Sequence, residues 1–221
     1  MNDNIERELK LVPLEPELLN RLASVERLGT FRVRGKRHEL QRNSFFDTPT
    51  RSLGSARIGF RRRTVSGRRQ AVWTLKADGE LVGGLATRSE IELELDRDLP
   101  PGLAIGALAD TARSRGAVPL AEEVHDALSA GGLPLATPML ETETDRTILD
   151  LEEPEHGWAV ELALDRMRLI GHDYADLEIE AELKFGDTQA LDVVRQAIEA
   201  IGEVRESRQS KLSRALAHLK S

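Results

Sequence analysis

The chain has 221 residues, 40% of them hydrophobic and 31% charged, which suits one large domain or two small ones with a substantial core. Its 38 acidic and 31 basic residues give a net charge of −7, and this disfavours a simple nucleic-acid binder, since such proteins are usually basic. The absence of cysteine excludes disulfides, thiolate metal sites and cysteine nucleophiles, and it fits the cytoplasmic location that we expect. No apolar run is long enough to span a membrane, and the first residues lack the pattern of a signal peptide.

The first expected strand, residues 5–11, sets a pattern that later strands repeat. Its alternation places Glu6, Glu8 and Lys10 on one face, so two carboxylates and an ammonium share that side. Apolar periodicity and turn residues predict the other elements. In chain order these are a helix at 15–28, an extended segment at 30–46, strands at 57–65, 70–76 and 88–95, a helical insert at about 103–131, strands at 140–151, 158–164 and 177–183, and C-terminal helices at about 187–219, divided into 187–201 and 207–219. The second of these two helices is expected to open near Ser210-Lys211.

Charges of one sign recur at two-residue spacing on these strands. The sets are Arg61 and Arg63; Glu90, Glu92 and Glu94; and Glu178, Glu180 and Glu182. For any single strand, a solvated face of an antiparallel sheet is the simplest interpretation. Like charges on one face disfavour each other, however, and a surface that only confers solubility mixes the two signs. The sets therefore predict that something of opposite charge binds there.

The helices can cover the apolar faces of the strands, which would turn the charged faces inward toward one another. Closing such a sheet gives a barrel with a charged, hydrated interior. Grouped carboxylates bind hard cations such as Mg²⁺ or Mn²⁺, and clusters of Arg and Lys bind phosphate. The combination predicts a metal–polyphosphate ligand.

Several motifs, in chain order, resemble those of the CYTH superfamily, the triphosphate tunnel metalloenzymes. They are Glu6-x-Glu8-x-Lys10, Phe45-Phe46-Asp47-Thr48, Phe60-Arg61-Arg62-Arg63 (with Phe in place of the family's Leu), Thr74-Leu75-Lys76, Arg88-x-Glu90-x-Glu92, Arg146, Glu161-x-x-x-Asp165, Glu178-x-Glu180-x-Glu182-x-Lys184 and Ser210-Lys211. The resemblance implies an α+β fold formed by a single CYTH-like domain over 1–221. Its core would be an eight-stranded antiparallel β-barrel, or tunnel, with helices packed outside.

The resemblance also implies a role for each charged residue. Phosphate oxygens would be bound by Lys10, Arg61, Arg63, Lys76, Arg146 and Lys211, with Arg88 and Lys184 assisting. Metal ions would be held by Glu6, Glu8, Glu180 and Glu182, with Glu90, Glu92, Glu161, Asp165 and Glu178 as further ligands or as partners of ligands. The metals would neutralise the triphosphate and position a water for attack on the terminal phosphorus. Sequence leaves open whether Lys76 or a metal-bound hydroxide activates that water.

The favoured function is metal-dependent hydrolysis of inorganic triphosphate, because aromatic residues form only 4% of the chain and offer little to recognise an organic group. A thiamine triphosphatase, a class IV adenylate cyclase and a polyphosphate- or nucleotide-binding module without turnover are alternatives. An RNA triphosphatase is disfavoured by the net charge. The expected partner is a triphosphate-containing small molecule. The insert at 103–131 could cover the barrel or mediate self-association, so a homodimer is left open.

Some charged and aromatic residues have simpler interpretations. Arg62 is expected to face away from its two arginine neighbours, and Trp73 and Trp158 are expected to pack in the core. Arg32, Arg34 and Lys36 share a face that is either a solvated strand edge or a tunnel mouth.

Overall fold

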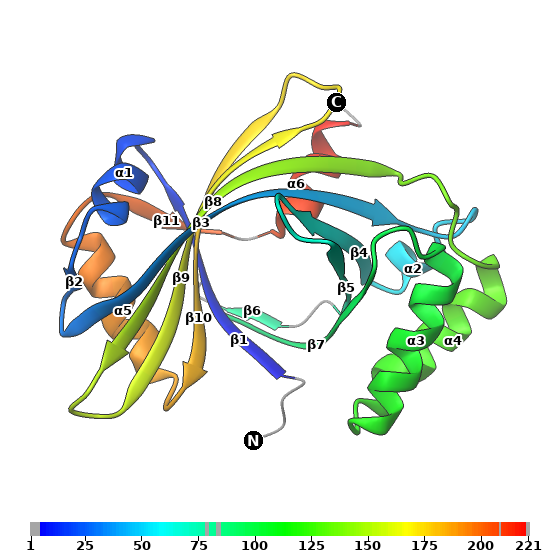
Figure 1. Cartoon of the computed structure of the whole chain (residues 1–221), viewed down its shortest axis with the longest axis horizontal. Coiled ribbons are helices and arrows are strands. Elements are labelled where there is room, and N and C mark those ends of the chain that lie inside the picture. Colours follow the sequence, from blue (N-terminus) through cyan, green and yellow to red (C-terminus); the bar gives the residue numbers. More distant parts are fainter. Residues whose placement is uncertain (1–4, 78–79, 83–84, 208, 220–221) are drawn as a thin grey trace. The chain divides into compact units, whose positions relative to one another are not determined.

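The computed structural model describes residues 5–77, 80–82, 85–207 and 209–219 (Figure 1). The strands are β1 Ile5–Pro13, β2 Arg27–Leu28, β3 Phe31–Phe46, β4 Ile58–Val65, β5 Gln70–Ala77, β6 Glu80–Val82, β7 Leu85–Asp96, β8 Leu140–Glu153, β9 Trp158–Leu169, β10 Ala175–Phe185 and β11 Val204–Glu206. The helices are α1 Glu17–Ala23, α2 Ser52–Ser55, α3 Pro101–Ser114, α4 Val118–Gly131, α5 Gln189–Glu199 and α6 Lys211–His218. None of these helices is both long and apolar enough to cross a membrane.

The strands form one sheet in the order β11-β1-β10-β9-β8-β3-β4-β5-β7-β6, with β2 paired to β3. An additional pairing between β1 and β7 closes eight of these strands into an antiparallel barrel. The predicted α+β class with an eight-stranded barrel is therefore confirmed.

The chain divides into two compact units. The first unit comprises Met1–Glu6, Gln41–Gly79 and Arg88–Glu143, and the second comprises Arg7–Leu40, Glu80–Thr87 and Thr144–Ser221. Each unit has a hydrophobic core of its own. That 1–221 forms a single domain stays a prediction.

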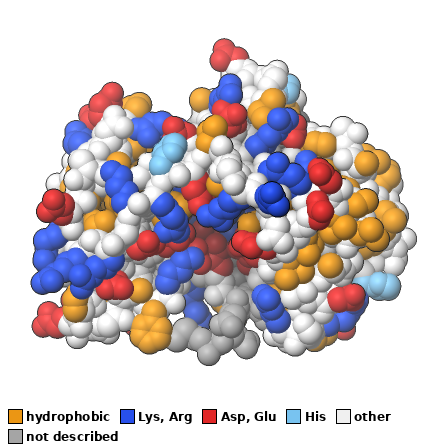
Figure 2. Space-filling view, viewed as in Figure 1, with side chains coloured by type: hydrophobic (Ala, Val, Ile, Leu, Met, Phe, Trp, Pro, Cys, Tyr) orange, Lys and Arg blue, Asp and Glu red, His pale blue; other side chains and the backbone are white. Residues whose placement is uncertain are grey.

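The core of the first unit joins the helical insert to one face of β4, β5 and β7. Phe60 and Trp73 stack with their ring centroids 5.5 Å apart, and Leu108 of α3 and Val124 of α4 belong to the same buried cluster. The insert predicted at 103–131 is thus confirmed as two helices, α3 and α4, which lie side by side in Figure 1. These helices also leave apolar side chains exposed, and Leu103 of α3 is 64% exposed. Hydrophobic side chains gather on the right of Figure 2.

The core of the second unit is built the same way. Leu9 of β1 and Leu164 of β9 are buried against Leu22 of α1 and Val194 of α5. Because β-strand side chains alternate, this packing leaves the opposite face of β1 and β9 for the charged residues. Trp158, expected in the core, is 9% exposed and belongs to this cluster.

One helix boundary differs clearly from the prediction. The helix predicted at 15–28 ends at Ala23, and Leu28 lies instead in β2, which pairs with β3. Gly29 makes that turn with φ of +57°, a conformation that side chains with a Cβ rarely adopt. The last helix, expected within 207–219 to open near Ser210-Lys211, begins at Lys211, and its N-cap Ser210 accepts a hydrogen bond from the backbone N–H of Ser213.

The short helix α2 was not predicted, although its cause lies in a motif that was. Asp47 is buried, and its carboxylate accepts hydrogen bonds from the backbone N–H groups of Thr48 (2.8 Å), Leu53 (3.0 Å) and Gly54 (3.1 Å). One side chain thus organises the whole turn after β3. The interpretation of this segment as turn chemistry is confirmed.

Candidate functional site

In the first unit, one face of the sheet brings predicted site residues together. The register of β5 with β7 places Lys76 opposite Glu90 and Thr74 opposite Glu92, and that of β4 with β5 places Arg61 opposite Thr74. Directly opposed residues of an antiparallel pair point to the same side of the sheet. This charged face therefore lies opposite the face that packs on α3 and α4.

Lys76 lies between two of the predicted metal ligands. Its Nζ is 2.5 Å from Glu6 Oε2 and 2.7 Å from Glu90 Oε2. Burial raises the pKa of Glu90 to about 7; Lys76 opposes this shift, and the negative charge of Glu6 adds to it. The carboxylate charge at this position is therefore not fully compensated, and further positive charge would be favourable there.

Arg61 contacts a carboxylate on the same face. Its Nη2 is 3.5 Å from Glu92 Oε1 and 3.4 Å from Thr74 Oγ1, and that hydroxyl donates a hydrogen bond to Glu92 Oε1 at 2.9 Å. Burial raises the pKa of Glu92, but Arg63 and Arg61 outweigh it and lower the pKa below its usual value. Both arginines therefore act on this carboxylate, which stays ionised at neutral pH.

Arg62 points to the other side, as predicted. Its guanidinium lies over the rings of Phe46 and Trp73 at 5.6 and 5.7 Å, and it donates to Ser44 Oγ and to the carbonyl oxygen of Arg97. The alternation of this arginine run is thus confirmed.

In the second unit, β1 and β10 place Lys10 directly opposite Glu180. Lys10 Nζ is 2.5 Å from Glu180 Oε1 and 3.2 Å from Glu8 Oε1. Lys10 and Glu8 are only 4% and 3% exposed. Charged groups are rarely buried to this extent unless they are paired, so Lys10 is not an ordinary surface lysine.

Arg146 of β8 and Lys211 of α6 join the same cluster. Arg146 binds Asp165 with two hydrogen bonds of 2.6 Å and Glu180 Oε2 with a third of 2.6 Å. Lys211 contacts the same Asp165 carboxylate and lies 3.2 Å from Glu180 Oε1. Burial raises the pKa of Asp165, but Arg146 and Lys211 outweigh it and lower the pKa. Asp165 is fully buried, and in this arrangement it holds Arg146 in place.

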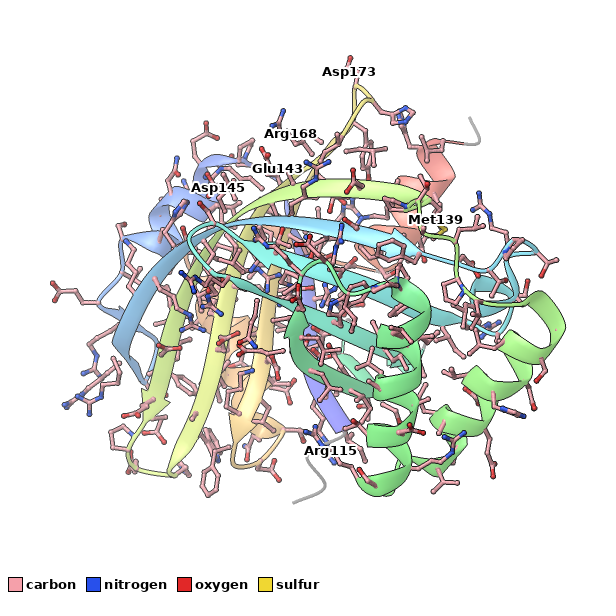
Figure 3. All side chains as sticks on the ribbon, turned by 45° about the vertical axis from the view of Figure 1, so that its right-hand side comes forward. Arg115, Met139, Glu143, Asp145, Arg168 and Asp173 are labelled. Carbon is pink, nitrogen blue, oxygen red and sulfur yellow. The ribbon has the colours of Figure 1, made fainter. Side chains whose placement is uncertain are left out.

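Asp145, which precedes Arg146 on β8, shows the contrast between the two faces of the strand. Asp145 points to the exposed side, where its Oδ1 is 2.7 Å from His38 Nε2 (Figure 3). Arg146 is mostly buried, with 12% of its side chain exposed. The predicted alternation along 140–151 thus sends one residue to solvent and the next into the charged cluster.

The remaining predicted residues of β9 and β10 form an ion-paired row. Lys184 Nζ is 2.6 Å from Glu182 Oε2 and 3.9 Å from Glu161 Oε1, and Glu161 lies opposite Glu182 in the register. Glu178, 1% exposed, has its Oε2 3.0 Å from Lys211 Nζ. All of the predicted residues in 144–211 therefore take part in ion pairs on this side of the second unit.

A family model described as the CYTH domain matches residues 4–216, nearly the whole chain. The chain belongs to the CYTH family. A curated relative, the inorganic triphosphatase of Haemophilus influenzae, is 29% identical over 154 residues. That match covers 67% of this CYTH chain but only 37% of the relative's length.

Two solved structures share the fold. One is a putative adenylyl cyclase from Hippeastrum, described as having a dominant triphosphatase activity; it is 21% identical, with a TM-score of 0.65 over 94% of this chain and 93% of that one. The other is a putative adenylate cyclase from Bacillus halodurans, also 21% identical, with a TM-score of 0.57 over 97% and 98% of the two chains. At this level of identity the likeness shows the fold alone.

The CYTH chain also has two charged residues near the site that the sequence reasoning missed. Arg37 donates to Asp150 Oδ1 at 2.7 Å and contacts Glu161, whereas the face predicted from this strand holds the even-numbered basic residues. Strand alternation was the available signal, since Arg37 has to face the side opposite Lys36. Arg214 binds Glu178, and its signal was its position three residues after Lys211, on the same helix face.

The donor set suits a divalent cation. Every predicted metal ligand offers carboxylate oxygens, which Mg²⁺ and Mn²⁺ prefer. Within the described part of the chain, no three His, Asp or Glu side chains converge in a ready metal site, because lysines and arginines occupy the space between carboxylates. Mg²⁺ is commonly bound by one or two carboxylates plus substrate phosphates, so Glu6 and Glu90 fit as a site that substrate would complete.

One predicted residue stays untested. Arg88 lies in β7, but its side chain is outside the part of the chain that the structure describes.

Proposed function

We propose that this CYTH chain is a metal-dependent triphosphatase that hydrolyses inorganic triphosphate and releases phosphate from a terminal phosphoryl group. The observation that carries the proposal is the convergence of three cations on one carboxylate. Lys10, Arg146 and Lys211 come from β1, β8 and α6, and each lies within 3.2 Å of Glu180. Donors from three separate elements, held in advance, suit a ligand with many anionic oxygens.

The roles of the basic residues follow from their geometry. In the second unit, Arg146 presents a planar guanidinium fixed by Asp165, whereas Lys10 and Lys211 present ammonium groups. In the first unit, Arg61 and Lys76 lie beside carboxylates that can share a ligand with them. The proposed phosphate-binding residues are Lys10, Arg61, Arg63, Lys76, Arg88, Arg146, Lys184 and Lys211.

The carboxylate residues are proposed to bind metal ions or to hold the residues that bind them. The proposed metal-binding residues and their partners are Glu6, Glu8, Glu90, Glu92, Glu161, Asp165, Glu178, Glu180 and Glu182. Mg²⁺ or Mn²⁺, when bound, would neutralise phosphate charge and orient the attacking water. Lys76 is the proposed catalytic residue, because its ammonium is held between the carboxylates of Glu6 and Glu90 and could donate a hydrogen bond to a phosphate oxygen bound there.

The aromatic residues favour an inorganic substrate over an organic one. Phe46, Phe60 and Trp73 are buried against one another in the first unit, and Phe31 and Trp158 are buried in the second. Phe45 lies opposite Arg61 in the register of β3 with β4 and shares its face, whereas Phe185 is 59% exposed at the end of β10 and Tyr174 stacks on His218. One aromatic side chain is therefore available on the face of Arg61, but no described pair of rings brackets a flat group, as an adenine or thiazole pocket would require.

The test is phosphate release from inorganic triphosphate, thiamine triphosphate, ATP and pyrophosphate, each with Mg²⁺ or Mn²⁺. We expect the highest kcat/KM for inorganic triphosphate and a loss of about 100-fold or more in Lys76→Ala. The matched control is Lys36→Ala, which removes an exposed lysine that donates to the carbonyl oxygen of Ala23. Equal turnover by the Lys76 and Lys36 variants would refute the site. Release of pyrophosphate from ATP would indicate a cyclase instead, and tight binding with no turnover would indicate a binding module.

A further inference from the structure

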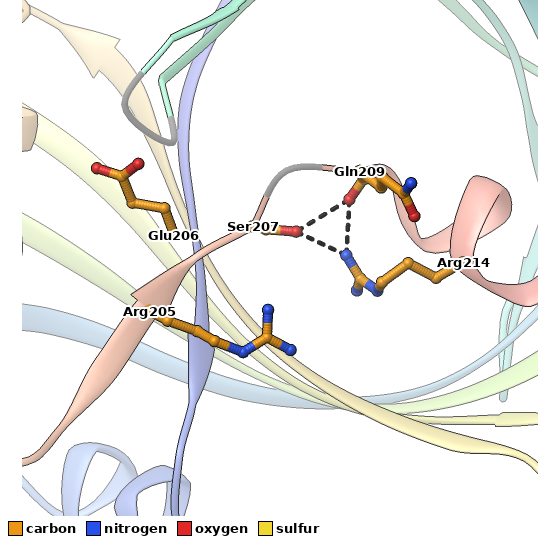
Figure 4. Close-up of a pocket in the computed structure, with 5 residues that line it drawn as sticks. All are labelled: Arg205, Glu206, Ser207, Gln209 and Arg214. Carbon is orange, nitrogen blue, oxygen red and sulfur yellow. Dashed lines mark hydrogen bonds between the residues drawn. The ribbon is translucent and has the colours of Figure 1, made fainter.

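Arg214 makes an unusually complete set of contacts for a residue in a short terminal helix. Its Nε donates to Asp176 Oδ2 at 2.6 Å, and its Nη2 donates to Glu178 Oε1 at 2.8 Å. Its Nη1 donates to Ser207 Oγ at 2.6 Å and to the carbonyl oxygen of Gln209 at 2.7 Å, at the edge of a pocket of about 400 Å³ (Figure 4). One guanidinium therefore joins α6 to β10 and to the segment that leads into the helix.

Glu178 connects this residue to the proposed site. Its Oε1 accepts from Arg214, and its Oε2 is 3.0 Å from Lys211 Nζ. Burial lowers the pKa of Arg214, but Glu178 and Asp176 outweigh it and raise the pKa above its usual value. The carboxylate of Glu178 thus lies between two cations that are one helical turn apart, and both are positioned against it.

Apolar burial contributes little to the position of the helix, since Ala215 is the only residue of the described α6 that is buried. Polar and ring contacts hold it instead: Lys211 pairs with Asp165, Glu178 and Glu180, and His218 stacks on Tyr174 with ring centroids 4.8 Å apart. Lysine has a flexible four-carbon side chain, so the position of the Lys211 ammonium depends on how firmly the backbone of α6 is held.

We infer that Arg214 is a positioning residue that anchors α6 on β10 and thereby fixes Lys211 against Asp165, Glu178 and Glu180. This inference rests on the proposed triphosphatase function, in which Lys211 binds phosphate. Arg214 acts through Lys211 and Glu178 and makes no contact with substrate itself. Its planar guanidinium donates hydrogen bonds to four acceptors at once, and the ammonium of a lysine cannot do so.

A double-mutant cycle with Lys211 tests the coupling. Arg214→Gln should lower kcat/KM for triphosphate roughly 10- to 100-fold, and Arg214→Lys should restore little of it. In a Lys211→Ala background the same Arg214→Gln change should cost less than about 3-fold, because the residue it positions is already absent. The control is Arg34→Gln, which breaks the exposed Arg34–Glu152 pair and should leave kcat/KM unchanged.

A measurement that does not depend on turnover separates this inference from the proposed function. Amide hydrogen exchange over 209–219 should quicken in Arg214→Gln and stay at the wild-type rate in Arg34→Gln. Unchanged exchange in Arg214→Gln would overturn the anchor. Quicker exchange in Arg214→Gln together with the full wild-type kcat/KM would overturn the positioning role. Effects of the Arg214 and Lys211 substitutions on kcat/KM that are independent of each other would also overturn it. If the wild-type protein neither hydrolyses nor binds triphosphate, the proposed function and the positioning of a phosphate-binding lysine fail together, whereas the exchange result still decides whether Arg214 anchors the helix.

Discussion

Replacing Arg146 with Met should lower the free energy of unfolding substantially, because it leaves a buried carboxylate without its main partner. Three hydrogen bonds of 2.6 Å are lost, two to Asp165 and one to Glu180. At about 1.5 to 3 kcal/mol for each charge-assisted bond, the gross loss is roughly 4 to 9 kcal/mol. Lys211 still contacts Asp165, and Lys10 still contacts Glu180, so we expect a net loss of about 3 to 5 kcal/mol.

The assay is urea unfolding at pH 7, with two comparisons. Arg37→Met removes a guanidinium that also bridges two carboxylates, but its side chain is 39% exposed, so solvent screening should hold its cost below about 1 kcal/mol. Adding Asp165→Asn to Arg146→Met removes the uncompensated charge and should reveal a coupling of about 1 to 3 kcal/mol. If Arg146→Met lowers the free energy of unfolding by no more than Arg37→Met does, the reasoning that burial makes the ion pairs of Arg146 strong is refuted.

Three further outcomes are expected. Leu108→Ala in α3 should cost about 2 to 5 kcal/mol in urea unfolding, and Leu103→Ala, at an exposed position of the same helix, should stay within about 0.5 kcal/mol; equal costs would contradict the assignment of the core face. Burial raises the pKa of Glu141, but hydrogen bonds from Arg42 and Ser44 outweigh it and hold the pKa below 4.5. Its contribution to stability is therefore present above pH 4.5 and is lost as the pH falls through the lower folded value, so Arg42→Gln should lower the melting temperature more at pH 7 than at pH 3. Phe45→Ala should leave kcat/KM for inorganic triphosphate within about 3-fold, and a larger loss, or one confined to thiamine triphosphate, would favour an organic substrate.

Much of the fold was predictable because its signals are local. Two-residue alternation placed Arg61 with Arg63 on one face of their strand and Glu90 with Glu92 on one face of theirs, and the structure pairs both strands in register with β5. Helical spacing likewise identified the insert at 103–131. Each of these inferences needs only the chain within a strand or a helix.

The parts that failed depend on residues outside the element concerned. The helix at 15–28 reads as continuous from its leucines, but the pairing of β2 with β3 competes for its last residues. The role of Arg37 requires Asp150 and Glu161, which lie more than 100 residues further along the chain. The buried carboxylate of Asp47 could be read as a turn signal, but not as the acceptor for backbone groups as far as Gly54.

The pairing of β1 with β10 has a consequence for synthesis of the chain. Lys10 and Glu180 are 170 residues apart, so β1 has no partner from β10 until the residues between them have been synthesised. At 5 to 20 residues per second, that delay is about 10 to 30 s. An unpaired strand edge invites contact with other nascent chains, and charged side chains along it discourage such contact. Glu6, Glu8 and Lys10 would therefore protect the nascent chain from aggregation before any ligand is bound.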